Sequence, residues 1–281
     1  MPSIRGIKLR IKSINSTQHI TKAMNLVAAS KLQRAKAKLS QNKAYYEETK
    51  RVMASIAAAG RNVRHPLMTP RREVKNNLLV VITSDRGLCG SYNVNVSREA
   101  RKFMRTVGNV YNVISVGNKG KEFFRRRKKK VLETFTGISE NPFYDDAAVI
   151  AGMALDLYRN GTVDCVYLAY TEFISTISYQ PKIMRLLPLE APETVSVSGM
   201  IYEPSEEAVL DALIPKYLET VMFGALLESA ACQLGARMTG MDAATDNAGK
   251  MMDKLNLQYN RARQGAITQE ITEIVSGANA L

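Results

Sequence analysis

The feature that most constrains the fold is a long N-terminal stretch that favours a single helix. No proline lies between Ser3 and Arg64, and the only glycines there are Gly6 and Gly60. The first apolar residues follow spacings of three and four, which is typical of a coiled-coil seam: Ile4, Ile7, Ile11 and Ile14. A helix of about 55 residues, at 1.5 Å per residue, would be about 80 Å long. Because one face of a compact domain is much shorter, such a helix needs another long element to pack against.

Continued in register, this seam becomes polar in its middle. Its next members are Gln18, Thr21, Asn25, Ala28, Leu32, Ala35 and Leu39. Three further apolar residues, Ile20, Met24 and Val27, fall on a neighbouring stripe. The pattern therefore predicts a coiled-coil helix over residues 1–64, with a narrow contact seam.

The C-terminal residues 205–281 show the same kind of pattern. Ser205 is a favourable N-cap, and Glu206 and Glu207 suit the positive end of the helix dipole. From Leu210 a heptad seam continues through Leu213, Tyr217, Thr220, Gly224, Leu227, Ala231, Leu234, Met238, Met241, Thr245, Ala248, Met252, Leu255, Tyr259, Ala262 and Ala266. Pro215 is expected to kink this helix near its start. Two long helices with complementary seams predict an antiparallel coiled coil, and the small seam residues predict closely spaced backbones.

Between the two helices, residues 75–200 change to an alternation of strands and helices. The predicted strands are 78–83, 110–117, 163–173 and 177–189, and the predicted helices are 93–107, 119–127 and 144–161. This order is typical of a small, mostly parallel sheet with helices on its faces. The expected fold class is therefore α/β plus long helices: an antiparallel coiled coil of the terminal helices with a central Rossmann-like α/β domain.

The positive charge is concentrated near the N-terminus. The chain has 39 Lys and Arg against 26 Asp and Glu, a net charge of +13. Residues 1–60 hold 12 basic and 2 acidic residues, whereas residues 206–281 hold 6 basic and 10 acidic ones. Such a one-sided field indicates an acidic partner. One function consistent with it is a basic coiled-coil adaptor that binds nucleic acid through the N-terminal helix.

Cysteine and histidine offer no site for a metal or a disulfide framework. Cys89, Cys165 and Cys232 are far apart in sequence, there is no CxxC motif, and the two histidines stand alone. We therefore expect buried free thiols and a reducing environment. No apolar run approaches the roughly 18 residues that span a bilayer, and the N-terminus lacks the pattern of a secretory signal.

The segment LLVVITSDRGLCGSY at 78–92 places a glycine-bearing turn after a buried strand, where α/β proteins often bind phosphate. It matches neither GxxxxGK[ST] nor GxGxxG, and Asp85 puts a negative charge where phosphate would lie. The alternative is a tight turn in which Asp85 pairs with Arg86. No nucleophile elbow or HExxH motif occurs elsewhere. We therefore expect no cofactor and no enzymatic activity, and ATP binding by the isolated chain would overturn this.

A second basic feature is the run Arg125–Lys130, six consecutive Arg and Lys residues. It is suited to contact RNA or lipid, and it is equally compatible with a solvated loop. The sequence leaves its role open.

Four segments together resemble one known family. They are ITKAMNLVAASKLQ (20–33), SDRGLCGSYN (84–93), AATDNAGKM (243–251) and ARQGAITQEITEIVSGA (262–278). In this order, and over the whole chain, they are similar to γ subunits of F-type ATP synthases. The resemblance implies a non-catalytic rotor in the central stalk, which couples ion flow through the membrane c ring to ATP synthesis at the β subunits. It also implies α and β subunits (a hexameric ring), the ε subunit and the c ring as partners, with no nucleic acid.

The same resemblance implies site residues by matching motifs. Contacts to the α/β ring are expected from Lys22, Met24, Arg86, Cys89, Arg237, Arg263, Gln264, Thr268, Gln269, Glu270, Thr272 and Glu273. Contacts to ε and the c ring are expected from Tyr202 and Glu203. The Arg125–Lys130 run is not a hallmark of the family, and the two-cysteine insertion of photosynthetic relatives is missing. The resemblance thus implies a bacterial protein, peripheral to the cell membrane on its cytoplasmic side.

Overall fold

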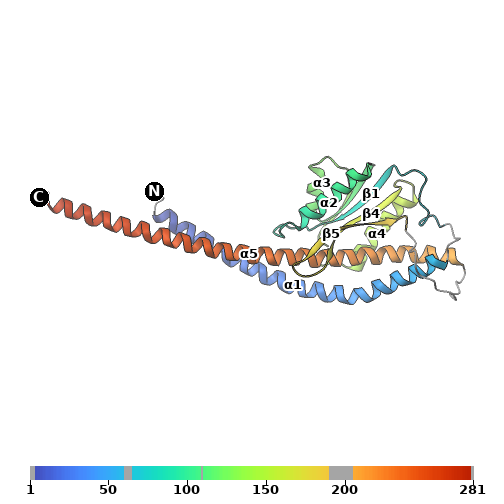
Figure 1. The fold of residues 1–281 in the computed structure, drawn as a ribbon, viewed down its shortest axis with the longest axis horizontal. Helices are drawn as coiled ribbons and strands as arrows, with labels where there is room; N and C mark the ends of the chain where they lie inside the picture. Colours follow the sequence, from blue (N-terminus) through green and yellow to red (C-terminus); the bar gives the residue numbers. More distant parts are fainter. Residues whose placement is uncertain (1–3, 60–64, 109, 190–204, 280–281) are drawn as a thin grey trace. The chain divides into compact units, whose positions relative to one another are not determined.

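The computed structural model describes residues 4–59, 65–108, 110–189 and 205–279 (Figure 1). The elements in chain order are α1 (Ile4–Ala59), β1 (Asn76–Ile82), α2 (Tyr92–Val107), β2 (Val110–Val116), α3 (Asn118–Arg125), β3 (Val131–Phe135), α4 (Tyr144–Arg159), β4 (Cys165–Phe173), β5 (Tyr179–Leu187) and α5 (Glu206–Asn279). The chain forms two compact units. Unit 1 comprises Met1–Ala28 and Met238–Leu281, and unit 2 comprises Ala29–Arg237. The unit boundaries lie inside both long helices, and the three-part division expected from the sequence stays a prediction.

Unit 2 is built on a five-stranded sheet in the order β3-β2-β1-β4-β5. The neighbours β3, β2, β1 and β4 are parallel, and β5 is antiparallel to β4. The mostly parallel sheet expected from the sequence is therefore confirmed. The edge strand β3 was missed, because its five residues follow the Arg125–Lys130 run directly and only partly bury their side chains.

Alternate residues of β1 serve two different cores. Leu78, Val80 and Ile82 pack on one face with α4 and the first part of α5. Leu79 and Val81 pack on the other face with α2 and α3. Both faces are buried, which explains why this strand is a continuous apolar run rather than an alternating one. Figure 1 shows α2 and α3 on the opposite side of the sheet from α4.

Within unit 2, α5 is buried along two stripes instead of the single predicted seam. One stripe faces the sheet core and includes Leu210, Ile214, Leu218, Val221 and Ala225. The other faces α1, where a Cβ added at Gly224 would lie 3.8 Å from atoms of both Asn42 and Tyr46. A heptad seam describes a helix with one partner, whereas this segment has two. α5 also continues through Pro215, and the expected kink stays a prediction.

The start of α5 has the cap that its sequence predicts. The Ser205 hydroxyl accepts a hydrogen bond from the backbone N–H of Ala208 at 3.2 Å. This bond satisfies one of the unpaired amides of the first turn.

Unit 1 is an antiparallel helix pair formed by α1 and α5. The Thr21 and Thr245 hydroxyls are 2.7 Å apart, and Asn25 Nδ2 donates to the carbonyl of Met238 at 3.0 Å. Gln18 Nε2 donates to the carbonyl of Thr245 at 3.4 Å. The polar middle of the predicted seam therefore consists of hydrogen bonds between the helices, and the antiparallel coiled coil is confirmed.

The burial of α1 follows the predicted seam closely. Ile7, Thr21 and Ala28 are buried, while Ile20 and Val27 on the neighbouring stripe are each 57% exposed. Small residues bring the backbones together, since a Cβ added at Gly249 would lie 3.3 Å from Gln18 Nε2. In the part of the chain that the structure describes, no helix is long and apolar enough to cross a membrane.

Candidate interaction surfaces

The loop after β1 is organised by Asp85. Its carboxylate accepts hydrogen bonds from the Ser139 hydroxyl at 2.7 Å, from the Gly137 N–H at 3.0 Å and from the Asn118 N–H at 3.3 Å. Asn118 begins α3, so this carboxylate occupies the helix N-terminus where a phosphate would bind. The expectation that the turn binds no nucleotide stays a prediction. The expected pairing of Asp85 with Arg86 was wrong, since Asp85 instead bonds to the two neighbouring loops.

The residue that this loop exposes to solvent is Leu88, whereas Cys89 is buried. Cys89 is only 2% exposed and packs against Tyr92, Cys232 and Ala236. Leu88 is 62% exposed and has a φ of 63°, a backbone conformation that bulky residues rarely adopt. Arg86 is exposed beside it. A partner would therefore meet Leu88 and Arg86 first, while Cys89 lies buried beneath them. The expected contact of Cys89 with a partner stays a prediction.

Arg237 was expected to contact a partner, but its side chain is mostly inside unit 2. Its Nη1 donates to Glu140 Oε1 at 2.6 Å, and Lys31 Nζ donates to Glu140 Oε2 at 2.6 Å. Arg237 is 7% exposed. Burial by itself raises the pKa of Glu140, but the bonds and charges of Lys31 and Arg237 outweigh it and hold that pKa below its ordinary value.

This arrangement joins three elements. We call Lys31 of α1, Glu140 of the loop before α4, and Arg237 of α5 the Glu140 clamp. Gln233 Nε2, one turn earlier on α5, donates to the carbonyl of Ser139 in the same loop. Because Ser139 also binds Asp85, the clamp connects both long helices to the carboxyl end of the sheet. Sequence reasoning missed it, because nothing in the sequence pairs Glu140 with its two cations.

In unit 1, the predicted contacts on α1 lie outside the helix seam. Lys22 is exposed and Met24 is half-buried. Leu26 is 64% exposed, and Ile20 and Val27 are also bare. At helical spacing, Ile20, Met24 and Val27 lie on one side of the seam, and Lys22 and Leu26 lie on the other. Both sides of α1 therefore expose apolar side chains that no described residue covers.

The C-terminal end of α5 extends past the helix pair. In the register of unit 1, Ile4 lies level with about Tyr259, and α1 begins there. The predicted polar residues beyond it are all exposed: Arg263, Gln264, Thr268, Gln269, Glu270, Thr272 and Glu273. Sequence reasoning overlooked the apolar stripe between them. Ile267, Ile271 and Ile274 are 46%, 55% and 71% exposed, at the helical spacing that the sequence already shows.

The remaining expected contacts, Tyr202 and Glu203, lie outside the described residues. Within the described ranges, no group of three or more His, Cys, Asp or Glu side chains could hold a metal ion. The arrangement thus offers contact surfaces: the Leu88 loop in unit 2, and the bare faces of α1 and of the α5 end in unit 1. Large bare apolar side chains in rows are typical of surfaces that other proteins cover.

Comparison with known proteins decides what these surfaces belong to. Residues 3–281 match the ATP synthase protein family. The ATP synthase gamma chain of Alkaliphilus metalliredigens is 48% identical over 287 residues, covering 99% of this chain and 98% of the relative. That of Desulfitobacterium hafniense is 46% identical over 281 residues, covering 100% of both. The chain belongs to the ATP synthase gamma chain family.

Solved structures agree with this family. A chain from the central stalk and c-ring of the Tetrahymena thermophila mitochondrial ATP synthase has a TM-score of 0.63 at 27% identity, covering 80% of this chain and 99% of that one. A chain from the rotor of the Euglena gracilis enzyme has a TM-score of 0.69 at 18% identity, covering 94% and 98%, and shows the shared fold. The resemblance to gamma chains expected from the sequence is confirmed, and the nucleic-acid adaptor has no support.

Proposed function

We propose that the chain is the non-catalytic rotor of the central stalk of a bacterial ATP synthase. It couples ion flow through a membrane c ring to ATP synthesis at the β subunits. The observation that carries this proposal is the helix pair of unit 1, which continues as a single α5 with a bare row of isoleucines. A helix end that exposes such a row needs a partner that surrounds it with apolar side chains. A ring of α and β subunits supplies such a surrounding surface.

Two further surfaces meet the same ring. Lys22 and Met24 on α1 face an acidic segment of the β subunit, to which the basic helix is attracted at short range. Arg86 and Leu88, in the loop that follows strand β1, contact the β subunit. Arg263, Gln264 and the polar residues from Thr268 to Glu273 flank the apolar row and bond to the surrounding loops.

The other end of the rotor, which we call its foot, connects the chain to the membrane part of the complex. Tyr202 and Glu203 contact ε and the c ring, which attaches the protein peripherally to the cytoplasmic side of the cell membrane. Rotation enters there and passes into α1 and α5, which the Glu140 clamp ties to the sheet. Each β site then changes its relative affinity for substrates and product as the rotor turns, and this difference supplies the coupling.

The proposal is tested by co-expressing a tagged chain with α and β subunits. The wild-type chain is expected to co-purify with both and with ATPase activity. A variant with Ile267→Ser, Ile271→Ser and Ile274→Ser is expected to fold normally but to assemble with at least tenfold lower yield or coupled activity. A matched control places serine at Val149, Ile174 and Ile177, which are 58%, 57% and 81% exposed and lie in unit 2. Equal behaviour of the two variants, or a wild-type chain that captures neither subunit, would contradict the proposal.

A further inference from the structure

The outer helical layer of unit 2 is a second strongly basic part of the protein, besides the N-terminal helix. We call α2, α3 and the loop after α3 (residues 92–107 and 118–130) the basic layer. It contains twelve Lys and Arg against two Glu, a local net charge of +10. Residues 1–60 carry the same local net charge of +10, so the two basic parts are compared directly in the test below.

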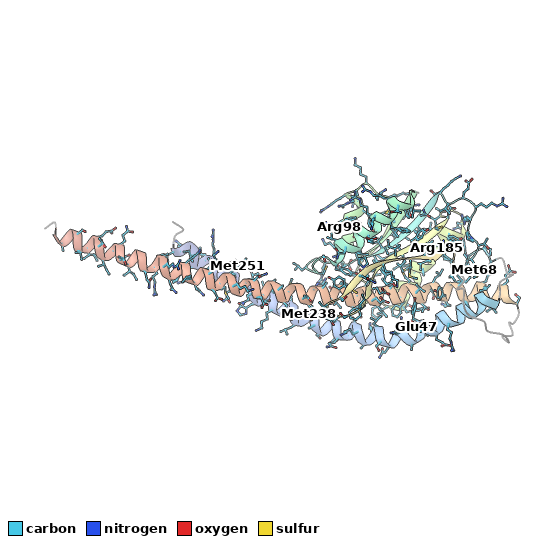
Figure 2. The ribbon with its side chains drawn as sticks, in the orientation of Figure 1. Glu47, Met68, Arg98, Arg185, Met238 and Met251 are labelled. Carbon is cyan, nitrogen blue, oxygen red and sulfur yellow. The ribbon has the colours of Figure 1, made fainter. Side chains whose placement is uncertain are left out.

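Few of these cations are neutralised within the protein. Lys119 pairs with Glu122 at 3.0 Å, and Lys102 lies 3.9 Å from Glu99. Among the described residues, no carboxylate forms an ion pair with Arg98, Arg101, Arg105 or any member of the Arg125–Lys130 run. All six residues of the run are exposed. Arg98 on α2, which is labelled in Figure 2, is exposed as well.

The topology gathers these cations at one edge of the sheet. In a parallel sheet the helices return to the amino ends of the strands, so α2 ends beside the start of β2, and α3 ends beside the start of β3. The end of the run lies directly beside β2, since the N–H of Val113, in the middle of β2, donates to the carbonyl of Lys130 at 3.0 Å, and β3 begins there. Lys102 and Arg105 therefore lie at the same edge as the run. We call it the amino edge.

The backbone of the run retains a lysine where glycine is usual. Lys128 has a φ of 53°, and it follows α3 in a turn closed by Lys128 N–H to Arg125 O and Lys129 N–H to Phe124 O. This is the left-handed C′ position of a helix end, which glycine normally occupies. A charged lysine side chain therefore occupies a position where the backbone conformation favours glycine, which has no side chain.

The first turns of α5 also lie at the amino edge. Asp211, in the second turn of α5, lies 3.9 Å from Arg159 at the end of α4 and 3.1 Å from His65. Since α4 leads into β4, the start of α5 is at the amino edge too. If the chain is the rotor proposed above, this edge faces the membrane and the Glu140 clamp is at the other edge.

We propose that the basic layer docks on the anionic phospholipid headgroups of the membrane beneath the rotor. This inference rests on the proposed function for the direction in which the edge faces. Lipid fits better than nucleic acid, because single-stranded nucleic acids are held by exposed aromatic rings as well as cations. Here the guanidinium carbon of Arg127 lies 3.7 Å from the centre of the Phe123 ring and covers it, and Phe103 packs edge-on against Tyr167. These two rings are therefore engaged within the protein and do not form a stacking surface for bases.

The test measures binding of the purified full-length chain to vesicles. Phosphatidylcholine vesicles with and without 30% phosphatidylglycerol are compared at low and high salt. Each Lys or Arg near an anionic bilayer strengthens binding about fivefold. Replacing all six residues of the run by glutamine is therefore expected to weaken binding to anionic vesicles by at least about 100-fold, with no effect on neutral ones.

A matched control removes six exposed cations from α1 by substitution with glutamine: Arg5, Lys8, Arg10, Lys12, Lys22 and Arg34. This variant has the same net charge as the run variant and is expected to keep most of the vesicle binding. Equal loss in both variants, or unchanged binding of the run variant, would overturn the inference. Run-dependent binding of a single-stranded RNA oligonucleotide, without vesicle binding, would do so as well.

Assembly with α and β subunits separates this inference from the proposed function. The run variant is expected to co-purify with both subunits like the wild-type chain. Weakened vesicle binding with intact assembly supports lipid docking. Intact assembly with unchanged vesicle binding removes lipid docking and leaves the rotor proposal standing.

Discussion

Replacing Glu140 by glutamine tests how the long helices are held to the sheet. The side chains of Arg237 and Glu140 are 9% and 21% exposed and are joined at 2.6 Å. Removing one partner of a buried pair typically costs about 3–5 kcal/mol. Glu140 is partly exposed and glutamine keeps an acceptor, so we expect the free energy of unfolding to fall by about 2 kcal/mol.

The matched control changes the exposed side of the same clamp. The Lys31 side chain is 47% exposed, so Lys31→Gln is expected to cost less than about 1 kcal/mol. Urea denaturation of the full chain measures both variants. If Lys31→Gln costs as much as Glu140→Gln, burial does not determine the strength of the clamp, and the reasoning is refuted.

The pH dependence provides a second check on the clamp. The pKa of Glu140 is lowered in the folded chain, although burial alone would raise it. The stabilisation is therefore fully present above the unfolded pKa, and it is lost as the pH falls through the lower folded pKa. The stability difference between wild type and Glu140→Gln should stay constant near pH 7 and shrink below about pH 4. A difference that does not change with pH would contradict the charge pairing.

Three further outcomes follow from local geometry. Lys128→Gly, at a φ of 53°, is expected to raise the free energy of unfolding by about 1 kcal/mol, and a decrease would contradict the left-handed assignment. Gly235→Ala would place a Cβ 2.9 Å from the Thr176 carbonyl oxygen, so thermal denaturation should show a loss of about 1–3 kcal/mol, whereas no loss would mean that the two elements are not in close contact. Burial raises the pKa of the Cys165 and Cys232 thiols, and all three cysteines are buried, so a disulfide reagent at pH 8 should modify none in the native chain and three in denaturant. Rapid modification of the native chain would show that these cores open.

Periodicity predicted the elements whose partners repeat along the chain. The seam of α1 from Ile4 to Leu39 was predicted from spacing alone, since each member meets the same helix. The apolar run of β1 likewise predicted a strand buried on both faces. These features depend on regular patterns that extend over many residues, and a regular pattern is visible without knowledge of the fold.

The features that the sequence did not predict depend on single contacts between distant residues. Glu140 and Arg237 are 97 positions apart, and only the fold brings them together. Motif matching predicted Arg237 and Cys89 as partner contacts, and it gave no sign that both side chains are buried within unit 2. Their contacts with a partner stay a prediction. Leu88 gave no signal, because leucine rarely adopts a left-handed φ and is usually buried, whereas here it does the first and is 62% exposed.

The central claim is that α1 and α5 act as one body in the rotor, and a disulfide between them tests it most directly. Thr21 and Thr245, whose hydroxyls are 2.7 Å apart, are replaced by cysteine in the assembled complex, with each single variant as a control. We predict that oxidation forms the intramolecular cross-link in high yield while coupled ATP synthesis continues at the uncross-linked rate. A pair that fails to cross-link, or a cross-link that stops synthesis, would show that the two helices do not turn together.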